Sequence, residues 1–187
     1  MALRKIPYRK LAALVADRLW IDEDETTLLL VRRLRHARAR GYLTPSELEE
    51  ACRWKSSRAT ALVRSNTASK VRAATRRAFA ARNESARLEE LLTLRGVSVA
   101  TASAILTMLD PRRYAVLDIR CWQLLHAMGA VTGNRAGTAF TTKNWSEFIS
   151  VVRQLAKRFG VKARDVERAL FMAHREYQEG RLYRRPG

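Results

Sequence analysis

The chain has 187 residues, 47% of them hydrophobic, which is enough for one well-buried core. Its 36 Lys and Arg outnumber its 18 Asp and Glu, and the net charge of +18 favours nucleic acid as partner, with an anionic membrane surface or acidic proteins as alternatives. The apolar stretches are too short and too interrupted by arginine to span a membrane, and the N-terminus lacks a signal-peptide pattern, so we expect a cytoplasmic protein. Two cysteines, Cys52 and Cys121, are too few for a disulfide framework or a four-cysteine metal site, so we expect two free thiols.

Apolar residues recur at three- and four-residue spacing, and alternating runs of β-branched residues are absent, so we predict an all-α fold. Helices are expected over 8–19 and over 22–40, the second ending at Gly41. The run from Thr44 to Glu47 combines a capping box with a proline at the first helical position. It predicts a helix through Trp54, with Arg64 as an alternative end.

A strongly basic stretch follows, because no acidic residue occurs over 51–83. Its basic residues are Arg53, Lys55, Arg58, Arg64, Lys70, Arg72, Arg76, Arg77 and Arg82. We expect this stretch, including a helix over 69–82, to face phosphate groups. Phosphate contact and simple solvation are equally weighted for Lys55 and Arg58. Trp54 could line a pocket or a groove of DNA, but one buried Trp on an exposed helix is the favoured interpretation.

The C-terminal part contains one long Gly- and Thr-rich segment over 129–142, which predicts a loop. The run from Asn144 to Glu147 predicts a capping box for a helix that ends near Phe159. A last helix is expected over 163–178, followed by a frayed tail over 181–187. We expect a single domain over 1–187, with two lobes as an open alternative.

The segment over 88–129 holds a tight turn from Leu94 to Ser98 between two predicted short helices. Gly96 supplies the positive φ that such a turn needs, and Ser98 can cap the next helix. The backbone N–H groups of Val99, Ala100 and Thr101 would then lack helical partners and form an anion site, suited to a DNA phosphate. A plain packing corner between two helices is the equally weighted alternative.

Asp110 precedes a proline and predicts the end of the second of these helices. An extended apolar approach over 114–117 then leads to Asp118, where the next helix begins. An aspartate at this place is most often an ordinary N-cap.

These residues carry a resemblance. The sequence LRGVSVATASAIL, followed after a short interval by VLD and a new helix, resembles the signature of the helix-hairpin-helix DNA glycosylase superfamily. The resemblance covers about a fifth of the chain, with its motif positions at Gly96, Val97, Thr101, Ala102 and Asp118. It implies a helix-hairpin-helix glycosylase-like helical fold, a hairpin that binds DNA phosphate, and Asp118 as the catalytic residue.

Two positions depart from the family pattern. Ser98 stands where the family has a second hairpin glycine, which leaves a monovalent cation at the hairpin carbonyls only as an open alternative. Ala100 stands where bifunctional members carry a Schiff-base lysine, and an alanine is not a nucleophile. The resemblance therefore implies hydrolysis of an N-glycosidic bond without strand cleavage; Lys55 or another lysine could substitute, but nothing in the spacing supports that.

The carboxylate suits this role, because glycosidic cleavage builds positive charge on the sugar. The damaged base would leave the duplex and enter a pocket lined by aromatic or apolar groups. The available aromatic residues are Trp54, Tyr114, Trp122 and Trp145. Arg120 and Trp122 follow Asp118 at once, and helical geometry lets at most one of them face the same cleft.

Two functions are expected from these observations. The first is a monofunctional DNA glycosylase acting on double-stranded DNA with a damaged or modified base, as a monomer and without a cofactor. The alternative is a catalytically inert protein that binds distorted or branched DNA through the same hairpin. His36, His126 and His174 lack the spacing of a zinc catalyst, so we expect structural roles for them and no metal enzyme.

Overall fold

The computed structural model describes residues 2–180 and 182, and in this part of the chain the fold is all-α. The N-terminal helices are α1 (Leu11–Ala16), α2 (Glu25–Arg40), α3 (Pro45–Lys55), the 3-10 turn η1 (Ser57–Ala59), α4 (Thr60–Arg64) and α5 (Ala68–Ala80). The remaining helices are α6 (Glu84–Leu92), α7 (Val99–Leu109), α8 (Ile119–Ala127), α9 (Thr142–Phe159) and α10 (Ala163–Tyr177). The all-α prediction is confirmed, and the specific topology inferred from the resemblance remains a prediction.

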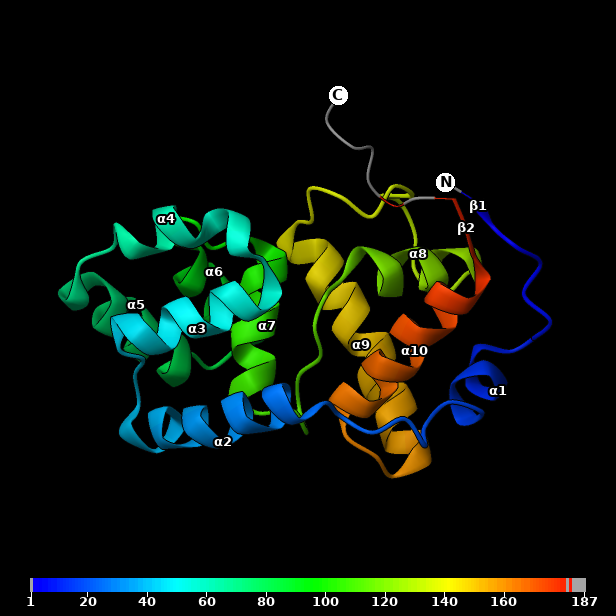
Figure 1. Cartoon of the computed structure of the whole chain (residues 1–187), viewed down its shortest axis with the longest axis horizontal. Helices are drawn as coiled ribbons and strands as arrows, with labels where there is room; N and C mark the ends of the chain where they lie inside the picture. The colour runs from blue at the N-terminus through cyan, green and yellow to red at the C-terminus, as the bar shows by residue number, and fades with distance from the viewer. Residues whose placement is uncertain (1, 181, 183–187) are drawn as a thin grey trace.

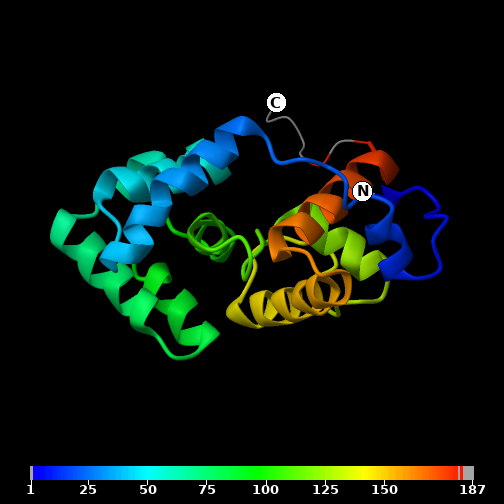
Figure 2. The same ribbon diagram turned by 90° about the horizontal axis from the view of Figure 1, so that it is seen from below.

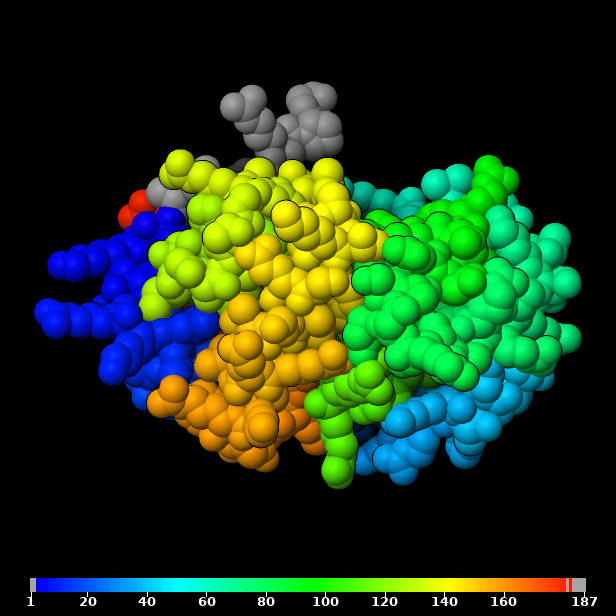
Figure 3. Space-filling model, turned by 180° about the vertical axis from the view of Figure 1, so that it is seen from behind, coloured from blue at the N-terminus to red at the C-terminus, as the bar shows by residue number. Residues whose placement is uncertain are grey.

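The helices form two groups with α7 between them (Figure 1). Helices α2 to α6 gather on one side, where α2 and α3 both contact α7. Helices α1, α8, α9 and α10 gather on the other, with α10 packed against α8 and α9 (Figure 2). On the opposite face, α9 lies beside the green helices that include α6 (Figure 3). The meeting of the two groups therefore brings segments together that are far apart in sequence.

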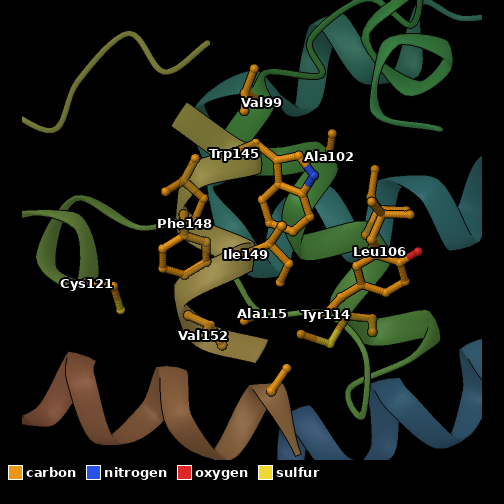
Figure 4. Packing of buried hydrophobic residues seen from close by; sticks show 14 of the residues in the cluster. Val99, Ala102, Leu106, Tyr114, Ala115, Cys121, Trp145, Phe148, Ile149 and Val152 are labelled. Carbon is orange, nitrogen blue, oxygen red and sulfur yellow. The ribbon is translucent and has the colours of Figure 1, made fainter. Parts of the chain in front are cut away.

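Buried apolar side chains from α7, α9 and the segment over 114–117 join the two groups (Figure 4). Trp145 and Phe148 of α9 are fully buried, with ring centroids 6.1 Å apart. Tyr114 stacks on Trp145 at 6.3 Å, and Ala102 of α7 leaves room for this packing. The extended segment that leads to Asp118 is thus part of the core, which restrains where Asp118 can lie.

Several predicted helix ends are confirmed. Gly41 ends α2 with φ of 83°, a left-handed conformation that favours glycine. Thr44 and Glu47 form the predicted capping box of α3. Asp110 ends α7 as expected for a residue before proline.

Other predicted boundaries are wrong. The first helix covers only Leu11–Ala16 rather than 8–19. Helix α3 does not continue to Arg64, because Ser56 is extended at φ −164° and ψ 122° and the chain restarts in η1 and α4. The capping box of α9 joins Thr141 to Asn144, so Asn144 is its third helical residue and not its N-cap. The spacing of Thr141 and Asn144 already carried this signal.

The two chain ends meet in a short strand pair that helical periodicity does not predict. β1 (Ala2–Leu3) pairs antiparallel with β2 (Gln178–Glu179). The predicted frayed tail lies outside the described residues, apart from residue 182. Among the described residues, every helix is too short or too polar to cross a bilayer. Cys52 and Cys121 are free, as predicted, and both are buried.

Candidate functional site

Asp118 lies where the extended segment over 114–117 turns into α8. The backbone just before it is held from both sides: the Leu117 N–H donates to Ser103 Oγ of α7 at 2.9 Å, and the Val116 N–H donates to Glu167 Oε2 of α10 at 3.4 Å. Both acceptor side chains belong to helices that the core already fixes. The position of Asp118 is therefore set by α7 and α10.

The Asp118 carboxylate makes two different contacts. Oδ1 accepts the Arg120 N–H at 2.8 Å, so the residue is the predicted N-cap of α8. Oδ2 accepts from Lys55 Nζ of α3 at 2.5 Å. The side chains of Asp118 and Lys55 are each only 16% exposed. The sequence places these two residues far apart, and the fold makes them an ion pair that is largely shielded from water.

This ion pair lies in the wall of a cavity of about 390 Å³. The cavity is bounded by residues 21–24, the end of α3, Val116, Asp118 and α10. Its apolar lining comes from Ile21, Trp54, Val116, Phe171 and Met172. Its other lining residues are charged: Asp22, Glu23, Asp24, Lys55, Asp118, Arg164, Glu167, Arg168 and Arg175. The volume is that of a small-molecule site, and the charged groups could fix the orientation of a ligand against the apolar part of the wall.

A network of buried charged side chains forms part of the cavity wall. The Arg164 guanidinium binds Glu23 at 2.6 and 3.0 Å and also contacts the Glu167 carboxylate. Burial raises the pKa of the Glu167 carboxyl above its usual value, and Arg164 offsets this only in part. Burial by itself would also raise the pKa of the Glu23 carboxyl. Hydrogen bonds and charge attraction from Arg164 and Arg168 outweigh burial and lower this pKa below its usual value.

Trp54 is half-buried in the cavity wall. Its indole N–H donates to Thr27 Oγ1 at 2.8 Å, and the Arg164 guanidinium lies 5.3 Å from the ring centroid. The two interpretations of this residue are therefore both realised in part, since Trp54 packs against the core and also lines the cavity with Lys55.

The turn from Leu94 to Ser98 joins α6 and α7, and its geometry follows the sequence expectation. Gly96 has φ of 80°, and the side chain of Ser98 accepts the Thr101 N–H at 3.2 Å. The expectation that the Thr101 N–H stays without a partner is thus wrong, because Ser98 caps it. The Val99 and Ala100 N–H groups have no acceptor among the described residues. Two backbone donors are left at the start of α7, where an anion is stabilised.

Asn66 anchors this turn, a role that the sequence did not reveal. Its side-chain oxygen accepts the Arg95 N–H at 2.9 Å, and its amide donates to the carbonyls of Arg95 and Val63 at 2.9 and 2.8 Å. The Arg95 carbonyl oxygen is therefore engaged and less able to serve as a ligand for a monovalent cation. Within the described residues, His, Cys, Asp and Glu form no group of three or more that could hold a metal ion.

Three residues singled out with Asp118 lie elsewhere. Tyr114 is buried in the core and accepts from Arg87 at 2.8 Å, outside the cavity. Trp122 is fully buried and donates to the Asn134 carbonyl at 2.9 Å. The side chain of Arg120 lies 5.5 Å from the Phe171 ring and contacts Gln178, again outside the cavity lining. None of these three side chains lines the cavity with Asp118.

The basic stretch over 51–83 is partly neutralised by its neighbours. Arg53 and Arg64 both pair with Glu49, at 3.4 and 2.7 Å. Arg77 pairs with Glu90 at 2.7 Å. Lys70, Arg72, Arg76 and Arg82 are exposed, as is Arg58 in η1, beside the turn. The exposed cations thus flank the start of α7 through η1 and continue along α5.

Most residues of the cavity wall carry no signal that marks them as site residues in the sequence. Glu23 fell within the helix expected over 22–40, although α2 begins only at Glu25, and the residues of α10 were assigned only to a C-terminal helix. Arg164 and Glu167 are buried on the face of α10 that also carries Val166 and Leu170. Charged residues that interrupt an apolar stripe were the available signal.

In comparisons with known proteins, no protein-family model, no curated protein and no solved structure matches the chain.

Proposed function

We propose that this protein is a DNA glycosylase that hydrolyses the N-glycosidic bond of a damaged or modified base, with Asp118 as the catalytic residue. The observation that carries this proposal is the carboxylate of Asp118 in the wall of a cavity of about 390 Å³, lined by Trp54 and Phe171. Aromatic walls can stack on a base that has left the duplex. A carboxylate beside the sugar stabilises the positive charge that builds up as the bond breaks.

The hairpin formed by α6, the turn and α7 would supply the docking contact. The Val99 and Ala100 N–H groups point out of the start of α7, and a helix N-terminus binds a phosphate without reading the base. The exposed cations of η1 and α5 extend this surface, and the net charge of +18 favours a polyanion. The hairpin offers no amine, because Ala100 occupies the first turn of α7.

One observation favours the second candidate, a catalytically inert protein that binds distorted or branched DNA. Both carboxylate oxygens of Asp118 are engaged, one with the Arg120 N–H and one with Lys55. Such contacts would suit a purely structural aspartate that caps α8 and ties it to α3. The two candidates share the hairpin and differ in whether base release depends on Asp118.

The test is base release from duplexes that contain alkylated, deaminated, oxidised or mismatched bases. The wild-type protein is compared with Asp118→Asn, and abasic sites are cleaved by hot alkali in a separate step. Asparagine keeps the size and the capping ability of aspartate, so DNA affinity should persist while base release is lost. Asp17→Asn, which removes one exposed negative charge outside the cavity, is the matched control.

The outcomes separate the candidates. Alkali-dependent cleavage by wild type and Asp17→Asn, but not by Asp118→Asn, would support the glycosylase and identify its lesion class. Tight binding without release across the panel would support the inert binding protein. Either candidate requires affinity that falls steeply with salt, since each neutralised phosphate releases counterions. Salt-independent binding to duplex DNA would contradict both.

A further inference from the structure

A second cavity, of about 350 Å³, lies at the C-terminal end of α7. Leu106 and Leu109 of α7, Phe79 of α5 and Tyr114 form its apolar wall, and Figure 4 shows Leu106 and Tyr114 together. Helix α7 has 11 residues and rises about 1.5 Å per residue, so its two ends are roughly 16 Å apart. The second cavity shares no lining residue with the cavity at Asp118 and is a separate place on the molecule.

The charged part of the second cavity is strongly unbalanced. Three arginines line it: Arg38 from α2, Arg87 from α6 and Arg113 from the turn after α7. The carboxylate among its lining residues is that of Asp110. Three positive charges against one negative charge leave the lining at +2 at pH 7.

The carboxylates around this cavity are already shared among the arginines. Asp110 Oδ2 pairs with Arg38 at 2.9 Å, and Glu84 Oε1 pairs with both Arg113 and Arg153, at 2.5 and 3.3 Å. Counting Glu84 and Arg153 with the lining gives four arginines against two carboxylates, so the sum stays at +2. Like charges held this close repel one another, and an anion in the cavity would offset that repulsion.

Arg87 is the arginine of this group that no carboxylate of the described residues neutralises. Its terminal nitrogens donate to Tyr114 Oη at 2.8 Å and to the Ala81 carbonyl oxygen. Burial raises the pKa of the Tyr114 hydroxyl to about 12, so both acceptors are neutral at pH 7. The Arg87 Nε is buried and has no acceptor among the described residues. A half-buried guanidinium without a counter-charge is costly, and its fork of N–H donors matches phosphate oxygens.

We propose that the second cavity binds a small phosphate monoester that carries an apolar group, such as a free nucleoside monophosphate. A phosphate monoester has a charge of about −1.5 to −2 at pH 7, close to the excess of the arginines, and its oxygens accept charge-assisted hydrogen bonds from them. The volume lies within the range of small-molecule sites, roughly 300–1,000 Å³. Phe79 and the two leucines offer an apolar surface to the base.

This inference does not rest on the proposed glycosylase activity. The hairpin that would dock on DNA lies at the start of α7, and the second cavity lies at the other end of the same helix. A nucleotide and a duplex should therefore bind at the same time. Failure of base release would leave the nucleotide site untouched, and failure of nucleotide binding would leave the glycosylase proposal untouched.

The experiment is isothermal titration calorimetry of the full-length protein with deoxyadenosine monophosphate and with deoxyadenosine. Deoxyadenosine lacks the phosphate and should bind at least about tenfold more weakly. Arg87→Met keeps much of the length of the side chain but removes its charge, so it should weaken nucleotide binding by about tenfold or more. Arg38→Met should weaken binding about threefold, and its side chain is 61% exposed, so the variant should fold. Arg35→Met removes an exposed charge of α2 outside both cavities and should bind as wild type.

Four results would overturn the inference. The first is no binding of the nucleotide to wild type at millimolar concentration, and the second is equal binding of deoxyadenosine. The third is wild-type affinity in both Arg87→Met and Arg38→Met. The fourth is displacement of the nucleotide by duplex DNA: an unphosphorylated duplex that displaces it would place the nucleotide on the DNA-binding surface, and displacement only by a 5′-phosphorylated duplex would assign the site to a DNA end. If Arg87→Met proves unfolded by circular dichroism, Arg38→Met and the displacement experiment still decide.

Discussion

Replacing Gly96 by alanine should destabilise the protein more than the same change at another left-handed glycine. Gly96 has φ of 80°, and a Cβ added there would lie 2.9 Å from both the Val63 backbone N and Val63 Cγ2, and 3.0 Å from the Ala59 carbonyl oxygen. The left-handed conformation costs a non-glycine residue about 1 kcal/mol. Forcing backbone atoms of α4 and η1 apart adds roughly 1–3 kcal/mol, the usual cost of overpacking.

The matched control is Gly41→Ala. Gly41 has φ of 83°, but a Cβ there meets nothing within 4 Å, so only the conformational cost of about 1 kcal/mol applies. Urea unfolding should therefore give a loss of about 2–4 kcal/mol for Gly96→Ala and a clearly smaller one for Gly41→Ala. Equal losses for the two variants would refute the argument that the turn packs tightly on α4 and η1. If the turn docks on phosphate, folded Gly96→Ala should also bind duplex DNA more weakly than Gly41→Ala.

Three further predictions concern buried polar groups. Arg164→Met leaves the buried Glu167 carboxylate without its cation and should lower the free energy of unfolding in urea by about 3–5 kcal/mol. Adding Glu167→Gln should restore part of that loss, and no restoration would show that the two residues are not coupled. Burial lowers the pKa of His174 to about 4, whereas the unfolded chain titrates near 6.5, so the contribution of this residue to stability is complete above pH 6.5 and is lost as pH falls to about 4. The wild type should therefore lose stability more steeply than His174→Gln over this pH interval. If urea titrations give the two proteins the same dependence of unfolding free energy on pH, the lowered pKa of His174 is contradicted. Burial raises the pKa of Cys52 to about 12 and that of Cys121 well above its usual value, so both thiols should resist iodoacetamide at pH 8 until urea unfolds the chain, and fast labelling of the native protein would disprove their burial.

Features that depend on neighbours along the chain could be predicted from the sequence. The left-handed Gly41, the Thr44 capping box, the stop at Asp110 and the cap at Ser98 all follow from interactions over three or four residues. The place of Asp118 as an N-cap could be predicted in the same way, because an N-cap is defined by the helix that it starts. The predicted start of α9 was wrong because two capping patterns overlap there, one over 141–144 and one over 144–147, and the first of them caps the helix.

The sequence by itself determined the all-α class, the excess of positive charge, the hairpin turn and the aspartate at the start of α8, since periodicity, composition and capping are local properties. Only the tertiary structure decided what faces that aspartate. Lys55 comes from another helix, and Arg164 and Glu167 from α10, so their meeting in one cavity wall depends on how the two groups of helices pack around α7. Because long-range contacts leave no fixed spacing in the chain, the ion pair of Lys55 and Asp118 could be found only after folding brought the two residues into contact.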